Sequence, residues 1–329
     1  MPTDAADPQK IRSKPRADTI RSIAVLEIAA SLAASGTERH RQAKVYLREQ
    51  GTADWSLCLF ASSTNEGVEA IASGQADLAM INPSAALTLA YRGTGVFRAP
   101  QPVRVVAVIP SADQCVFAVK KSTGLTCVED IASHRFPLRM SLRGQADHCL
   151  HLMLDDICAA AGFSLADVVA WGGEIRRESL SPPWPGDMKF QALAGGELDA
   201  IFDEGIGRWL DAAVGADMAF LPLSEPTVKK LEAQGYRRGV ISRSRHPRLP
   251  RDILTVDFSG WPIFVHAELP DALAWSICAA LEEKKHLIPW ESEGPLPIER
   301  MCRDSPSTPL DVPLHPAAER YWRQAGYLP

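Results

Sequence analysis

Polar residues of the kinds that bind small ligands follow several short apolar runs of this sequence. Asn82-Pro83-Ser84, Arg143 and the pair Asp203-Glu204 each come directly after such a run. An apolar run of this length is typical of a buried strand. In open α/β sheets, ligands bind at the ends of the strands. The pattern therefore predicts a binding site built from turns at strand exits.

Each of these turns allows a functional interpretation and a structural one. Arg143 could bind an anion, because a guanidinium group binds a carboxylate with two hydrogen bonds, or it could be a surface arginine. Asp203-Glu204 could serve as an acid/base pair only with a partner from elsewhere, and Asp203 could equally cap the following helix. The turn Ser62–Asn65 could cap a helix, and its exposed N–H groups would also attract an anionic or carbonyl group.

The sequence predicts neither a metal site nor a cofactor. His148, His151 and Asp155 have a helical spacing, but along one helix they would span about 10 Å, too far to share an ion. A helix surface is the simpler explanation for them. The G-x-S-x-G, Walker and G-x-G-x-x-G patterns are absent.

Composition excludes several classes of protein. The 329 residues carry a net charge of −5 and a pI near 5.9, so nucleic acid is not an expected partner. The apolar run Ile23–Ala34 is too short to cross a membrane and contains Glu27, so we expect an amphipathic helix and neither a membrane span nor an export signal. Seven scattered cysteines without a C-x-x-C pair argue against a disulfide framework.

A repeated unit suggests how the chain is divided. A helix tail ends at Gly74, Asp77 follows, and a strand comes next; about 120 residues later Gly196 and Asp199 stand in the same order before a strand. Gly ends helices readily because it adopts the left-handed conformation. The repeat fits two lobes of similar build, and it also fits a single large α/β domain.

The remaining pattern predicts alternating helices and strands. We expect Val168–Trp171, followed by Gly172-Gly173, to end a strand, and Thr255–Val265 to be one long extended run that returns to the first lobe. The helices expected with least ambiguity are Ser22–Ser35, His148–Ala161, Glu225–Gln234, Asp271–Lys285 and Pro316–Ala325.

Several motifs, in order, resemble one protein family. They are GQADLAMINPSAALTLAYRGTG, VFAVKKSTGLTCVEDIASHRFPLRMSLRGQADH, GGELDAIFDEG, FLPLSEPTVKKLE, AELPDALAWSICAALEE and PLHPAAERYWRQAGYLP. Together they are similar to the TAXI-type solute-binding subunits of TRAP transporters, over most of the chain from about residue 40 onward.

The resemblance implies a type 2 periplasmic-binding-protein fold, an α/β fold of two lobes, each a mixed sheet flanked by helices, with a ligand cleft between them. It implies a flexible tail at 1–18, a first lobe at 19–112, a second lobe at 113–250, and a return to the first lobe with C-terminal helices at 251–329. The ligand would be a small carboxylate-bearing solute, and TRAP membrane subunits would be the partners. The contacts implied by position are Ser62, Ser63, Thr64, Asn65, Asn82, Ser84, Ser141, Arg143, Gly144, Gln145, Trp171, Gly172, Asp203 and Glu204.

The sequence departs from the family at three places. The family's signal peptide and Gly-rich first turn are replaced by RSIAVLEIAASLAAS, the second-lobe turn reads Arg143–Asp147, and the third strand exit carries two acids. We therefore hypothesise that Arg143 takes a ligand carboxylate while Asp203 or Glu204 takes an amine or hydroxyl group. The alternative to transport is a cytoplasmic enzyme or ligand sensor on the same fold, such as a decarboxylase-like or precursor-synthesis protein. The resemblance implies a periplasmic location, whereas a true start at Met1 would imply the cytoplasm.

Overall fold

The computed structural model describes residues 17–34, 43–48, 56–61, 66–145, 148–179 and 188–329. Two units are distinguished along the chain, Met1–Arg41 and Gln42–Pro329. In the first unit the described part is helix α1 (Ala17–Ala34), which begins inside the predicted tail, five residues before the predicted start. Among the described residues, no helix combines the length and the apolar character needed to cross a membrane.

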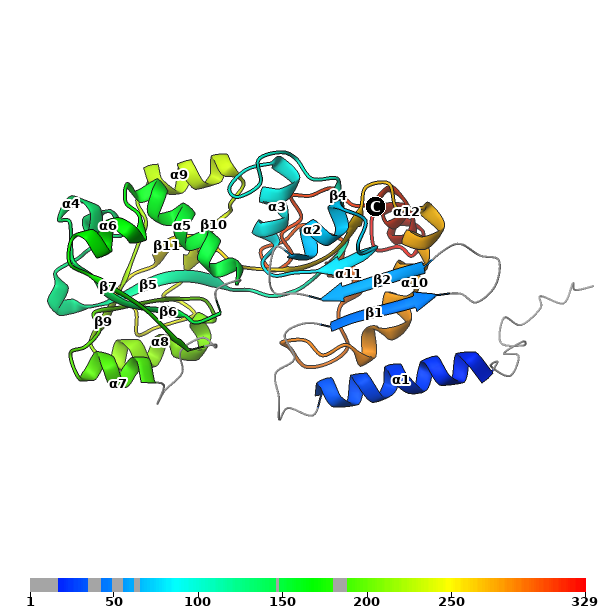
Figure 1. Cartoon of the computed structure of the whole chain (residues 1–329), viewed down its shortest axis with the longest axis horizontal. Helices are drawn as coiled ribbons and strands as arrows, with labels where there is room; N and C mark the ends of the chain where they lie inside the picture. Colours follow the sequence, from blue (N-terminus) through cyan, green and yellow to red (C-terminus); the bar gives the residue numbers. More distant parts are fainter. Residues whose placement is uncertain (1–16, 35–42, 49–55, 62–65, 146–147, 180–187) are drawn as a thin grey trace, which may run out of the picture. The chain divides into compact units, whose positions relative to one another are not determined.

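The second unit contains two sheets (Figure 1). The first sheet has five strands in the order β1-β2-β3-β12-β4. Strands β2 and β3 are parallel, and the other neighbours are antiparallel. Apolar side chains of α2 and α3 pack on one face, and those of α10, α11 and α12 on the other. The elements are β1 (Ala43–Arg48), β2 (Ser56–Ala61), α2 (Glu66–Ala72), β3 (Leu78–Met80), α3 (Ser84–Arg92), β4 (Val103–Ile109), β12 (Trp261–His266), α10 (Asp271–Lys284), the 3-10 turn η2 (Lys285–Leu287), α11 (Ile298–Met301) and α12 (Pro316–Gln324).

The second sheet has seven strands, of which six follow the order β10-β11-β5-β8-β6-β7, while β9 also pairs with β5. Its parallel pairs are β6 with β7 and β6 with β8. The elements are β5 (Gln114–Lys120), the 3-10 turn η1 (Lys121–Thr123), α4 (Glu129–Ser133), β6 (Arg139–Arg143), α5 (Cys149–Ala161), α6 (Leu165–Ala170), β7 (Glu174–Ser179), α7 (Met188–Ala194), β8 (Ala200–Asp203), α8 (Ile206–Gly215), β9 (Met218–Leu221), α9 (Glu225–Gln234), β10 (Arg238–Ile241) and β11 (Ile253–Asp257).

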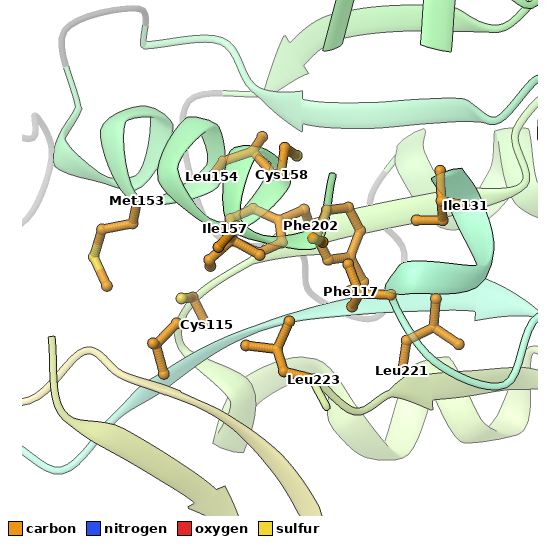
Figure 2. Packing of buried hydrophobic residues seen from close by; sticks show 14 of the residues in the cluster. Cys115, Phe117, Ile131, Met153, Leu154, Ile157, Cys158, Phe202, Leu221 and Leu223 are labelled. Carbon is orange, nitrogen blue, oxygen red and sulfur yellow. The ribbon is translucent and has the colours of Figure 1, made fainter. Parts of the chain in front are cut away.

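Strand β5 shows how one sheet separates two cores. Cys115, Phe117 and Val119 belong to the apolar cluster that includes α4, α5 and α9, whereas Val116 and Ala118 belong to the cluster that includes α7 and α8. Successive side chains of a strand point to opposite faces, so a continuous apolar run is required when both faces are buried. Figure 2 shows the first of these clusters, in which Phe117 packs against Phe202 of β8 with ring centroids 4.7 Å apart.

The repeated unit serves the same purpose in both sheets. Asp77 donates its N–H to the carbonyl of Cys58 and accepts the Cys58 N–H at 2.7 Å, which ties the start of β3 to β2. Asp199 donates its N–H to the carbonyl of Arg139 and accepts the Arg139 N–H at 3.3 Å, which ties β8 to β6. Gly74 and Gly196 both have positive φ angles, +73° and +77°, as expected for helix ends. The two sheets are therefore similarly built, and the two-lobed α/β architecture is confirmed.

Two extended segments connect the sheets. Residues 110–113 run from β4 to β5, and residues 258–260 run from β11 to β12. They lie side by side, because Phe258 N–H bonds to the Asp113 carbonyl and Gly260 N–H to the Ser111 carbonyl. The expected single run Thr255–Val265 is thus two strands in different sheets. Residues 253–257, assigned above to the return to the first lobe, form β11 of the second sheet.

One predicted strand is wrong. Val168–Ala170 lies in helix α6, which begins with a capping box between Ser164 and Asp167, and Trp171 ends that helix. The β-branched pair Val168-Val169 favoured a strand in isolation. The capping box Ser164–Asp167, directly upstream of that pair, is the local signal that outweighs it.

Candidate functional site

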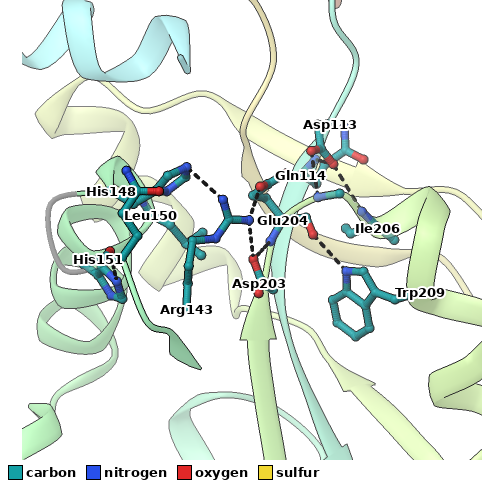
Figure 3. Close-up of polar contacts among 12 residues, drawn as sticks. Asp113, Gln114, Arg143, His148, Leu150, His151, Asp203, Glu204, Ile206 and Trp209 are labelled. Carbon is teal, nitrogen blue, oxygen red and sulfur yellow. Dashed lines mark hydrogen bonds and ion pairs between the residues drawn. The ribbon is translucent and has the colours of Figure 1, made fainter. Parts of the chain in front are cut away.

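Arg143, the last residue of β6, lies at the centre of a buried polar cluster (Figure 3). Its side chain is 6% exposed, and Nη2 lies 2.8 Å from Oδ1 of Asp203 and in short contact with Glu204 Oε1. Nη1 lies 3.0 Å from Nε2 of His148. The guanidinium group is thus held by two carboxylates and an imidazole of the same chain.

The topology of the second sheet brings these residues together. Strands β6 and β8 are parallel neighbours, with Ser141 beside Ile201, so their carboxyl ends lie at the same edge. Arg143 ends one strand, Asp203 ends the other, and Glu204 follows Asp203 directly. His148 is positioned by α5, whose first turn it caps by accepting the Leu150 N–H on Nδ1 at 3.1 Å.

The ion pairs offset part of the cost of burying these charges. Lys189, fully buried on α7, lies 3.2 Å from Oδ2 of Asp203, so this carboxylate faces two cations. Burial raises the pKa of Asp203, although Arg143 and Lys189 oppose the rise. Burial lowers the pKa of Arg143, but the carboxylates of Asp203 and Glu204 outweigh it and the net direction is upward. A buried ion network of this kind holds its side chains in one geometry.

Asp113 connects this cluster to the segments between the sheets. Its Oδ2 accepts the N–H of Gly205, the residue after Glu204 and the N-cap of α8, at 2.7 Å. Burial, and then the charge of Glu204, raise the pKa of Asp113 well above its usual value. Two carboxyl groups that lie close together are not easily ionised at the same time. Asp113 therefore fixes the Asp203-Glu204 turn against the first connecting segment.

The turn after β3 of the first sheet, which contains Asn82 and Ser84, bonds to the second connecting segment, residues 258–260. Ser84 donates its N–H to the carbonyl of Ser259, and Asn82 Nδ2 lies 3.5 Å from the carbonyl of Gly260. Ser259 Oγ in turn accepts the Asp113 N–H at 3.0 Å. A continuous series of hydrogen bonds thus runs from Ser84, through Ser259 and Asp113, to Gly205, which directly follows Glu204.

Three buried polar atoms of this region have no hydrogen-bond partner among the described residues. They are Oγ of Ser84, Oγ of Ser141 and Nε of Arg143. Ser141 and Arg143 are two apart on β6, so they share a face of the strand. A buried polar group without a partner costs free energy, which a ligand atom or water can recover. These three atoms are therefore the unpaired polar atoms of the cluster and of the turn that faces the connecting segments.

A model of the NMT1-like family matches residues 60–326, which is most of the chain. The chain belongs to the NMT1-like family. The match begins within β2 and extends past α12, so it contains the second sheet, both connecting segments and strands β3, β4 and β12 of the first sheet, while β1 precedes it.

Solved structures similar to this NMT1-like chain are solute-binding proteins. An alkanesulfonate-binding protein from Xanthomonas axonopodis pv. citri is 16% identical over 68% of this chain and 80% of its own, with a TM-score of 0.28. A glycine betaine/L-proline-binding protein from Borrelia burgdorferi is 11% identical over 68% and 75%, with a TM-score of 0.36. A TctC solute-binding protein from Polaromonas is 11% identical over 66% of this chain and 67% of its own, with a TM-score of 0.32. At these scores the superpositions are loose, and family membership rests on the sequence match.

Not every predicted contact of this NMT1-like protein lies near the cluster. Trp171 and Gly172 precede β7, whose first residue pairs with Arg139 at the start of β6, while Arg143 pairs with Ser179 at the other end. They therefore lie roughly 13 Å along the strand from Arg143. Trp171 instead packs against Phe163 in the apolar core. The error follows from the strand wrongly predicted at 168–171.

The other predicted residues divide into two groups. Ser62, Ser63, Thr64 and Asn65 lie outside the described residues. Gly144 and Gln145 follow Arg143 directly, and the Gln145 carbonyl lies 2.9 Å from Nε2 of His151. His148 and His151 thus have polar neighbours within the turn. Among the described residues, no group of three His, Cys, Asp or Glu side chains could hold a metal ion.

Sequence reasoning missed Asp113, Lys189 and Ser259 as parts of the cluster. Asp113 was recognised only as the boundary between the lobes, although a polar residue at a crossing between two sheets was a usable signal. No sequence pattern indicated that Lys189 is buried, because a lysine on an amphipathic helix is usually exposed. Its burial follows from the position of Asp203.

Proposed function

We propose that this protein binds a small, polar, carboxylate-bearing organic solute between its two lobes, as a TAXI-type solute-binding protein of a TRAP transporter. The observation that carries the proposal is the hydrogen-bonded series from Ser84, after β3 of the first sheet, to Gly205, in the turn after β8 of the second. It links strand exits of both lobes through the two connecting segments. The ordered sequence motifs support the TAXI assignment, and TRAP membrane subunits are the proposed partners.

The charge of the cluster refines the ligand class. Arg143 is already neutralised by Asp203 and Glu204, so it does not offer an unpaired positive charge. Its Nε, together with the hydroxyls of Ser84 and Ser141, remains available to ligand oxygen atoms. Glu204, whose side chain is 15% exposed, is the carboxylate best placed to meet an amine or hydroxyl. Amino acids and hydroxy acids fit this combination better than simple carboxylates do.

The first test is a thermal-shift screen of amino acids, hydroxy acids and simple carboxylates, because a ligand stabilises the folded state that binds it. For a confirmed ligand, calorimetric titration of Ser84→Ala and Ser141→Ala follows. Each substitution removes a hydroxyl that has no partner among the described residues, so the melting temperature should stay the same or rise. Affinity should fall about threefold to tenfold for each hydroxyl that bonds the ligand.

Ser276→Ala is the matched control, because that hydroxyl bonds only to the Ala272 carbonyl on the exposed face of α10. Ser276→Ala should leave the affinity for the ligand unchanged. Arg143→Ala tests the anchoring role of the guanidinium group. Unchanged affinity in Ser84→Ala, Ser141→Ala and Arg143→Ala together would show that the ligand binds elsewhere.

A ligand sensor on the same fold is the second candidate, and the cysteines favour it. All seven are free thiols, and six are buried. Cys278 and Cys302 lie close enough that, after burial, the charge of Cys302 contributes to raising the pKa of Cys278, yet they form no disulfide. Exported proteins commonly use disulfides, whereas free thiols persist in reducing compartments. Genes for membrane TRAP subunits beside this one would favour transport instead.

A further inference from the structure

A cavity of about 420 Å³ lies in the second lobe, away from the cluster around Arg143. It is lined by residues of β9, the end of α8, the loop between β10 and β11, and the segment after β5. None of the residues that line it belongs to the strand exits described above. Its volume falls in the range of small-molecule sites, about 300–1,000 Å³.

The cavity arises from a fork in the sheet. One edge of β5 pairs with β8 over Val116–Val119. The other edge is shared, since β11 pairs with Gln114 and Cys115, and β9 pairs with Phe117–Lys120. The two strands remain linked where the Leu223 N–H bonds to the Leu254 carbonyl at 2.8 Å. Beyond that bond β9 and the start of β11 diverge, and the cavity occupies the space between them.

The walls are apolar and the rim is cationic. Nine of the thirteen lining residues are apolar, among them Met218, Leu221, Leu249 and Ile253, which are nearly inaccessible to solvent. The charged lining residues are Lys121, Arg248 and Arg251, and none of the lining residues is acidic. Apolar walls with a few charged groups at the opening are typical of sites for amphiphilic ligands.

The neighbouring acids neutralise only part of this charge. Asp217 pairs with Lys121 at 2.6 Å. Asp130, beside the lining residue Thr126, accepts hydrogen bonds from Thr126 and from the Cys127 N–H. Arg248 donates to the main-chain carbonyl of Asp211. Neither the side chain of Arg248 nor that of Arg251 forms an ion pair with a described residue. Two guanidinium groups therefore remain for an anion.

We infer that this cavity is a second binding site, for a small amphiphilic carboxylate whose apolar body lies against Val214, Ala219 and Pro250 and whose carboxylate meets Arg251. Octanoate is the probe. Octylammonium has the same chain with the opposite charge, and 1-octanol has no charge. By calorimetric titration, octanoate should bind once per chain and more tightly than either control compound.

Two substitutions test the location. Arg251→Ala removes an exposed guanidinium group and should weaken octanoate binding threefold to tenfold, the range of one charge-assisted hydrogen bond at an open site. Ala219→Phe places a ring in the cavity and should abolish binding. Arg245→Ala, an exposed arginine of the same loop that does not line the cavity, should leave the affinity unchanged.

Three results would overturn the inference. They are no octanoate binding, equal binding of octylammonium, and octanoate binding that is insensitive to Arg251→Ala. Because Arg251 is exposed, its variant is expected to fold normally even if Ala219→Phe does not. Octanoate binding that responds to Glu204→Gln but not to Arg251→Ala would place the probe at the strand-exit cluster, which supports the proposed function while refuting the second site.

Discussion

Replacing Asp203 by Asn should destabilise the protein strongly, although the side chain keeps its size. Oδ1 of Asp203 accepts from Arg143 and from the Glu204 N–H, and Oδ2 accepts from Lys189. An amide has one acceptor oxygen and one NH2 group. In either orientation of the amide, the NH2 faces a donor, and the negative charge between two buried cations is lost.

The expected cost is about 3–5 kcal/mol, because removing one partner of a buried ion pair leaves a poorly compensated charge. The matched control is Asp217→Asn. Asp217 pairs with Lys121 at 2.6 Å, but these side chains are 77% and 56% exposed, so the loss should be at most about 1 kcal/mol. Asn also tolerates the positive φ of +57° at this position.

Urea unfolding at pH 7.5 measures both variants. Far-UV circular dichroism follows the whole chain, and tryptophan fluorescence includes the buried Trp209, whose indole donates to the Glu204 carbonyl. If the two probes give separate transitions, the lobes unfold independently and the fluorescence transition is compared. Equal losses for Asp203→Asn and Asp217→Asn would refute the reasoning, since the ion pairs have similar lengths and the larger loss is expected from the burial of Asp203 and its two cationic partners.

Two further predictions concern titratable groups. Burial raises the pKa of Asp257 to about 6, so its contribution to stability is complete below about pH 4 and is lost as the pH rises through 6, a change of roughly 2–3 kcal/mol. Urea unfolding from pH 4 to 7 should show this slope in the wild type relative to Asp257→Asn, and parallel curves would contradict it. A thiol reagent should find seven thiols in the unfolded protein and about one in the folded protein, because only Cys127 is partly exposed, and five thiols after unfolding would indicate a disulfide. That thiol should react slowly, since burial raises its pKa.

The fold was predictable where local and long-range signals agree. Gly74 and Gly196 each end a helix, and the aspartates after them tie parallel strands, so one repeated pattern indicated two similar sheets. Helix α9 was predicted to the residue, because Ser224 caps its start and Gly235 ends it. Prediction failed at Val168–Trp171, where β-branched residues lie in a short helix stabilised mainly by its capping box.

The candidate site was predictable in its members but not in its contacts. The pattern of strand exits identified Arg143, Asp203 and Glu204, and parallel strands guarantee that such exits are neighbours. Nothing in the sequence showed that the three side chains pair with one another, since that depends on burial by α5 and α7. Asp113 and Lys189 were missed for the same reason: each acquires its role from a residue distant in sequence.

The pairing within the cluster changes how the departures from the TAXI pattern are interpreted. Taken separately, Arg143 indicated a negatively charged group on the ligand, whereas Asp203 and Glu204 indicated an amine or hydroxyl group. Together with Lys189 they form a network of two cations and two carboxylates, which places no strong net charge beside a ligand. Selectivity would then depend on directed hydrogen bonds from Ser84, Ser141 and Nε of Arg143, because these buried atoms at the strand exits have no partners among the described residues. A ligand screen should accordingly favour compounds rich in hydroxyl and carbonyl oxygen over compounds selected for charge alone. A best ligand that is a simple dianion without hydroxyl groups would contradict this interpretation, because two carboxylates would then have to displace Glu204 from Arg143.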